Sequence, residues 1–129
     1  DLLFRAAHEP DSVKAKQLAT QAYVLMKARQ DRWFKGDDAN WKPYDDIFLT
    51  MEGLGQWAAY AWLSDPRGAA LPGLDAENGM RGGRRWWSQD EGLGLFLVID
   101  RFLPNWASQA FAERPVIGLD LLRQAVGFE

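Results

Sequence analysis

Cysteine is absent from this chain, and histidine occurs only once, as His8. The lack of cysteine excludes disulfide bonds, thiolate metal sites and cysteine nucleophiles, although it does not locate the protein, because many exported proteins also lack cysteine. A Ser-His-Asp catalytic arrangement would have to use His8, which lies close to the start of the chain. We therefore discount that chemistry here.

The chain also lacks an excess of basic residues and any long hydrophobic run. Its 15 Lys and Arg against 18 Asp and Glu give a net charge of -3 at pH 7. Binding to phosphates needs a basic surface, so we predict no nucleic-acid partner. The longest apolar stretch, residues 93–99, is much shorter than the ~20 residues that span a bilayer, so we predict no membrane segment.

What the chain does have is enough apolar material for a folded core. Its 129 residues are 47% hydrophobic and include 7 Trp, which is typical of a globular domain and not of a disordered chain. No segment alternates apolar and polar residues over any length, so we predict an all-α fold: one domain over residues 1–129, forming an irregular bundle of about four to five helices. The apolar start of the chain, Asp1 to Phe4, carries no methionine or signal peptide and indicates the cut end of a longer protein.

Prolines, glycines and capping residues indicate where the helices begin and end. We expect helices to begin near Ser12, Pro43, Ser88, Asn105 and Pro115. The helix over residues 88–103 is apolar on almost every side, so we expect it to be the most buried. Residues 64–87 are interrupted repeatedly by Gly and Pro, which predicts a long irregular loop that serves as a lid, a binding loop or a linker.

The helix expected after Pro43 has an unusually clean apolar stripe. Within it, the small residues Gly55 and Ala58 allow another helix to approach closely, and Glu52 lies at its margin. The stripe consists of Ile47, Phe48, Met51, Leu54, Gly55, Ala58, Ala59 and Trp62.

The tetrapeptide Glu-Gly-Leu-Gly occurs twice, at residues 52–55 and 91–94, and each copy precedes an apolar helical run. A carboxylate followed by small residues suits a metal-ligand helix, and it suits a helix cap equally well. For the second copy, Ser88 and Glu91 have the spacing of a capping box. We therefore predict that Ser88 caps the helix and Glu91 returns the interaction, and we assign no second site to Glu91.

Residues 50–60, Thr-Met-Glu-Gly-Leu-Gly-Gln-Trp-Ala-Ala-Tyr, resemble the third-ligand helix of gluzincin-like zinc metallopeptidases. In that family a Glu-Gly pair, followed by a large apolar residue, a small residue and an aromatic, comes after an H-E-x-x-H helix and completes a zinc site of two His and one Glu. The resemblance implies that Glu52 is the third zinc ligand and that Trp57 and Tyr60 lie near the site. It also implies that the loop over residues 64–87 covers it.

This chain contains no H-E-x-x-H motif, because His8 is followed by Pro10 and by no second His. The resemblance therefore implies an H-E-x-x-H upstream of Asp1 in a parent chain, with zinc as the cofactor of that parent and a peptide as its substrate. Residues 1–129 alone would be inactive and hold no stoichiometric zinc. The loss of the upstream part would leave an exposed apolar face through which the chain could associate with itself.

Two alternatives remain open for these residues. Glu52 can equally be a solvated carboxylate on a helix face. The whole chain can equally be a non-catalytic helical module that binds a protein or peptide.

The segment from Arg81 to Trp87 is a second candidate binding region. It combines Arg81, Arg84 and Arg85 with two glycines and two Trp, groups that can hold a carboxylate, a phosphate or a single-stranded base. The alternative is a solvated loop whose Trp residues anchor it to the core.

Overall fold

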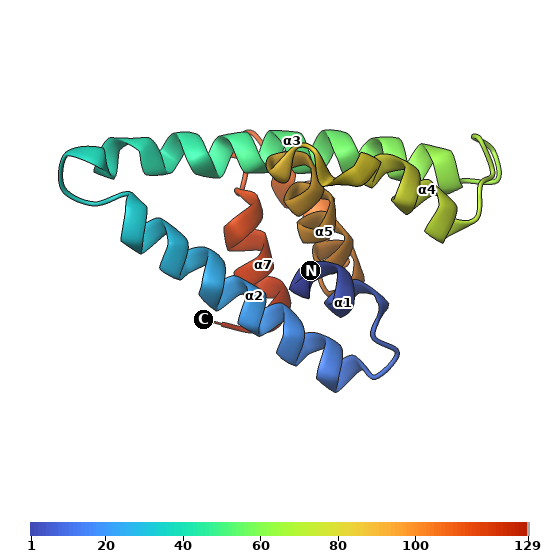
Figure 1. The fold of residues 1–129 in the computed structure, drawn as a ribbon, viewed down its shortest axis with the longest axis horizontal. Helices are drawn as coiled ribbons and strands as arrows, with labels where there is room; N and C mark the ends of the chain where they lie inside the picture. The colour runs from blue at the N-terminus through green and yellow to red at the C-terminus, as the bar shows by residue number, and fades with distance from the viewer. Residues whose placement is uncertain (129) are drawn as a thin grey trace.

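The computed structural model describes residues 1–128, and these residues form helices joined by short connections, with no strand among them (Figure 1). The all-α prediction is confirmed. The helices outnumber the four to five expected, because α1 and α4 form where the sequence indicated none. The elements are α1 (Leu2–His8), α2 (Ser12–Trp33), η1 (Gly36–Trp41), α3 (Lys42–Ser64), α4 (Gly73–Arg81), η2 (Gly82–Arg84), α5 (Trp87–Phe102), α6 (Trp106–Ala110) and α7 (Gly118–Val126).

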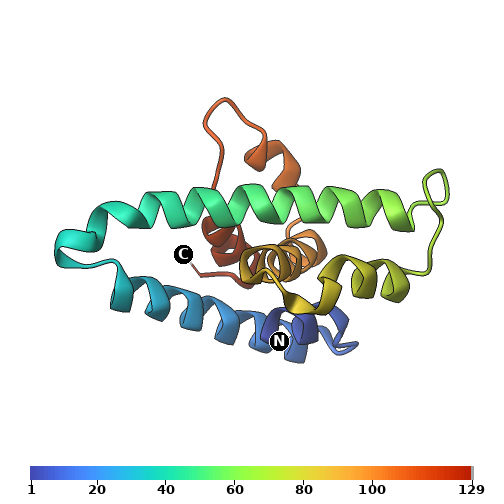
Figure 2. The same ribbon diagram turned by 45° about the horizontal axis from the view of Figure 1, so that its top comes forward.

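The long helix α3 runs along one edge of the molecule, and α2 diverges from it beyond the turn at η1 (Figure 1). The space between these two helices is filled by α5, α7 and α1. Figure 2 shows α5 nearly end-on between α2 and α3. Helix α5 packs against α3, α1 and α7, while α2 packs against α1 and α7.

Helix α5 forms the centre of the core, as its lack of a polar face predicted. Leu93, Leu95, Phe96, Val98 and Ile99 are each at most 1% exposed. Burial of so many large side chains from one helix supplies a major part of the hydrophobic stabilisation of the fold.

Helices α3 and α5 cross at two glycines that have almost no space between them. A Cβ atom placed on Gly92 would lie 2.7 Å from the Cα of Gly53, and one placed on Gly53 would lie 2.8 Å from the carbonyl oxygen of Gly92. Each glycine is the second residue of one Glu-Gly-Leu-Gly copy, so the repeated tetrapeptide marks a helix crossing. Gly55, which the sequence indicated as a close-approach position, has no atom within 4 Å of such a Cβ.

Residues 64–87 do not form one irregular loop, because they contain α4. Its buried residues are Ala76 and Glu77, and both carboxylate oxygens of Glu77 lie 2.8 Å from Nε2 of His8 on α1. Residues 82 and 83, which follow the helix, adopt positive φ angles, which explains why both positions are glycine. The sequence analysis missed this helix because its sequence has no strong local helix signal. Contacts with distant segments hold it in place.

The other boundary predictions had mixed outcomes. The side chain of Asp11 accepts hydrogen bonds from the first backbone amides of α2, and Pro43 lies in the first turn of α3. The helix expected from Asn105 through Glu113 is shorter, since α6 ends at Ala110, and α7 begins at Gly118 and not at Pro115.

Candidate functional site

The side of α3 that faces away from the core is apolar along the whole helix. Its five large side chains are between 51% and 67% exposed, and none of the exposed residues of α3 is charged or polar apart from the hydroxyl of Tyr44. We call this surface the outer face of α3. It consists of Pro43, Tyr44, Ile47, Phe48, Met51, Gly55, Ala58, Ala59 and Trp62.

The opposite side of α3 belongs to the core and carries both apolar and polar side chains. Leu49, Gly53 and Asp46 are buried there, and Trp57 packs edge-on against Trp106 of α6 with ring centroids 4.8 Å apart. The apolar stripe of a helix ordinarily faces the interior of a protein. The outer face therefore has the composition of a buried surface.

Glu52 lies at the edge of this outer face and is half-buried. Within residues 1–128, no group of three or more His, Cys, Asp or Glu side chains is placed to hold a metal ion. A zinc site at Glu52 would need its other ligands from outside these residues, so the zinc assignment stays a prediction. Trp57 packs in the fold as described above, and the hydroxyl of Tyr60 lies 3.4 Å from the position of a Cβ on Gly73 of α4.

The predicted capping box at the start of α5 is wrong. Trp86 is the N-cap residue, and it makes no side-chain capping hydrogen bond. Ser88 therefore lies inside the first turn, where it is buried. Its backbone amide is not at the N-cap position, so Glu91 does not complete a capping box with it. The spacing matched a capping box, but the helix starts earlier than the sequence indicated, so the two side chains point elsewhere.

Glu91 instead lines a cavity of about 590 Å³ between α1, α2 and α5. Burial raises the pKa of its carboxyl, and the guanidinium of Arg29 offsets part of that rise. The remaining influences on this pKa are a rise from Asp45 and from Asp90 and a decrease from the N-terminal ammonium. A carboxylate whose largest perturbation is desolvation is a candidate functional group. The sequence analysis explained Glu91 as part of a helix cap and so missed this candidate.

Arg29 forms its ion pair with Asp45 and not with Glu91. Two hydrogen bonds of 2.9 Å join the Arg29 guanidinium to the carboxylate of Asp45. Burial alone would raise the pKa of Asp45, but the hydrogen bonds from Arg29 and Gln30 lower it below its ordinary value. The guanidinium of Arg29 also lies over the ring of Trp87, 4.9 Å from its centroid.

The arginines of the second candidate region are mostly engaged within the fold. Nε of Arg81 lies 2.7 Å from the carboxylate of Asp90, and its guanidinium lies 3.6 Å from the ring centroid of Phe4. Arg84 pairs with Asp1 at 2.8 Å. Arg81 lies 3.7 Å from the same carboxylate, so Asp1 of the chain itself occupies two of the three arginines, while Arg85 is exposed.

The two tryptophans next to these arginines do not anchor the segment in the core. Trp86 and Trp87 are 63% and 50% exposed. The expectation of a core-anchored loop is therefore wrong, and both rings remain on the surface.

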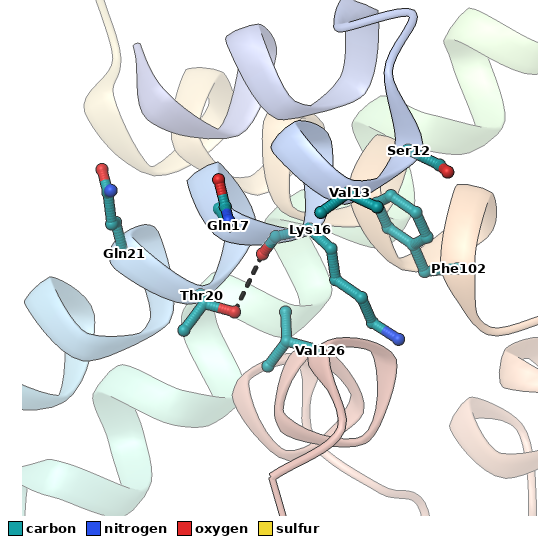
Figure 3. Close-up of a pocket in the computed structure, with 8 residues that line it drawn as sticks. All are labelled: Ser12, Val13, Lys16, Gln17, Thr20, Gln21, Phe102 and Val126. Carbon is teal, nitrogen blue, oxygen red and sulfur yellow. Dashed lines mark hydrogen bonds between the residues drawn. The ribbon is translucent and has the colours of Figure 1, made fainter.

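A second cavity, of about 730 Å³, lies along α2 opposite Phe102 and Val126 (Figure 3). Its polar groups come mainly from α2 itself, and the hydroxyl of Thr20 donates a 2.8 Å hydrogen bond to the backbone carbonyl of Lys16 (Figure 3). The lining residues include no carboxylate and no histidine. The cavity therefore offers no acid–base pair for catalysis.

Comparisons of this chain with protein-family models, with curated proteins and with solved structures give no match. Over residues 1–128, no helix combines the length and the apolar character needed to cross a membrane.

Proposed function

We propose that this chain is a non-catalytic helical interaction module whose outer face of α3 binds an apolar helix of a protein partner. The observation that carries this proposal is the uniform composition of the exposed side of α3. Applied to side chains of roughly 150–250 Å² each, the exposed fractions leave about 600 Å² of apolar side-chain surface uncovered, at the upper end for a monomer.

A helix is the partner that fits this surface best. The large residues Tyr44, Ile47, Phe48 and Met51 recur at spacings of three and four, which produces a straight ridge parallel to the helix axis. The small residues at positions 55, 58 and 59 lower the centre of the surface, so another helix axis can approach closely there.

The test uses a fluorescent, designed amphipathic peptide with a Leu and Ala face as the probe of the outer face. We expect the peptide to bind the chain, and we expect Met51→Glu to weaken that binding at least tenfold, because the variant removes apolar contact and places a charge in it. Fluorescence anisotropy measures the Kd. The matched control is Val24→Glu, since Val24 is also an exposed apolar residue, on α2, at 52% exposure against 67% for Met51.

The control variant should bind the peptide as the unmodified chain does. Equal affinity of the Met51→Glu and Val24→Glu variants would overturn the proposal. Circular dichroism of both variants should show unchanged helix content, because neither side chain belongs to the core.

A further inference from the structure

The outer face of α3 is complementary to itself when the helix is reversed about Gly55. Met51 lies four residues before Gly55 and Ala59 four residues after it, while Phe48 and Trp62 lie seven residues before and after it. In an antiparallel pair centred on Gly55, each Met51 would therefore face a small Ala59 of the other copy. Each Phe48 would face a Trp62.

We infer that the partner of the outer face is a second copy of this chain, with the two α3 helices antiparallel and crossing at Gly55. This inference rests on the proposed function and names the partner for the same surface. The α3–α5 crossing shows that this sequence already uses a glycine of the tetrapeptide to bring two helices together, at Gly53. Gly55 offers the same close approach on the opposite side of the helix, where nothing in residues 1–128 fills it.

Size complementarity favours the antiparallel orientation over the parallel one. In a parallel pair, Met51 would face Met51 and Ala59 would face Ala59 at the same level, which combines a clash with a gap. In the antiparallel pair Met51 meets the small Ala59 on each side of the crossing, and the aromatic rings of Phe48 and Trp62 meet farther from it.

The charges on α3 do not oppose this pairing. Between Asp46 and Asp65, Glu52 is the only charged residue. The two copies of Glu52 would be offset by about 9 Å along the axis at 1.5 Å per residue, close to the ~8 Å screening length at physiological salt. Their repulsion is therefore weak, whereas a parallel pair would bring them level with each other.

The area is near the lower end of the range for a specific dimer. Tyr44 falls opposite position 66, beyond the end of the partner's α3 at Ser64, so four large side chains of the face remain and contribute about 500 Å² per copy. Leu54, Ala58 and Ala59, along the same face and its margin, add to this, and the smallest specific interfaces bury about 600 Å² per partner.

Disulfide trapping tests the orientation, because the chain has no cysteine of its own. A disulfide needs Cα atoms within about 7 Å. A Cβ on Gly55 meets no atom within 4 Å, so we expect Gly55→Cys to fold and to form a covalent dimer rapidly under mild oxidation. In the antiparallel pair the two Tyr44 positions are about 33 Å apart along the axis, so Tyr44→Cys should form no disulfide-linked dimer.

A second pair of variants covers the case in which a side chain at position 55 disturbs the crossing. Chains with Met51→Cys mixed with chains carrying Ala59→Cys should form mixed disulfides faster than either forms with itself. Val13→Cys, on the exposed side of α2, measures random collision. Tyr44→Cys dimers that form as fast as Gly55→Cys dimers would indicate a parallel pair and overturn the inference.

The oligomeric state separates this inference from the proposed function. We expect the unmodified chain to sediment as a dimer and Met51→Glu to sediment as a monomer with the same circular dichroism. A chain that stays monomeric at several hundred micromolar overturns the dimer, and if it still binds the designed peptide the proposed function stands. Binding of a monomer to phosphatidylcholine vesicles, abolished by Met51→Glu, would place the outer face against lipid and overturn the inference.

Discussion

Replacing Gly92 by alanine tests how the fold is held together at the α3–α5 crossing. The added Cβ would lie 2.7 Å from the Cα and 2.8 Å from the amide nitrogen of Gly53, whereas carbon atoms pack best at ~3.5–4.0 Å. Because the obstructing atoms belong to the backbone, α3 and α5 must separate by about 1 Å along the line between these atoms. That separation loosens the contacts of the most buried helix.

The expected cost is the difference between two terms. Overpacking of this kind costs about 1–3 kcal/mol, and alanine returns up to about 1 kcal/mol through its higher helix propensity. We therefore expect Gly92→Ala to lower the free energy of unfolding by about 1–2 kcal/mol. Urea unfolding followed by circular dichroism measures this change, which should shift the midpoint and leave the slope unchanged.

The matched control is Gly79→Ala, which lies inside α4 with no atom within 4 Å of the added Cβ. This variant should gain up to about 1 kcal/mol, because only the propensity term applies. Gly53→Ala should resemble Gly92→Ala, because its Cβ would lie 2.6 Å from the ring of Phe96. A Gly92→Ala protein as stable as the Gly79→Ala protein would refute the close crossing.

Four further predictions follow from individual side chains. Ile99→Asp should unfold the protein, because Ile99 is 0% exposed and an unpaired buried charge costs several kcal/mol; a retained thermal transition would contradict its position. Arg81→Met should cost about 2–3 kcal/mol in urea unfolding, because it leaves the carboxylate of Asp90 without its 2.7 Å partner; an unchanged midpoint would contradict this. The pKa of Glu91 is raised in the folded state, so the folded protein binds more protons than the unfolded chain and its stability falls as pH rises through that pKa. Glu91→Gln should therefore raise Tm at pH 7 and lose that gain below the unfolded pKa of about 4.3, and a larger gain in acid would contradict the sign. In a longer parent chain, Glu52→Gln should reduce bound zinc strongly if Glu52 is a ligand, and metal analysis that finds zinc absent from the parent, or unchanged in the variant, would reject the metallopeptidase hypothesis.

Local sequence patterns were sufficient wherever one physical effect dominated. Helix α5 could be placed at the centre because residues 93–103 have almost no polar side to expose, and any other position would leave that surface in water. The starts of α2 and α3 were also predictable, because Asp11 and Pro43 have strong local preferences for helix N-termini. The apolar stripe of α3 was likewise visible in the sequence.

Local patterns failed where two structures shared the same pattern. The spacing of Ser88 and Glu91 fits a capping box with Ser88 as the N-cap, yet the N-cap of α5 is Trp86, two residues earlier. Helix α4 has a glycine-rich sequence with weak intrinsic preference, and contacts such as that between Glu77 and His8 hold it in place.

Composition and periodicity, which act within a single helix, were enough to predict that this protein is helical, that α5 is at the centre of its core and that α3 carries a continuous apolar stripe. Which side of α3 is buried depends on contacts between helices. The exposed side is the apolar stripe, whereas the core-facing side carries Asp46 beside Leu49 and Gly53, so periodicity alone would bury the wrong side. The close contact between Gly53 and Gly92, which are distant in the chain, holds α5 against the core-facing side. With α5 on that side, the apolar stripe of α3 is exposed to solvent. Glu91 lies beside a cavity, although the sequence pattern indicated a helix cap.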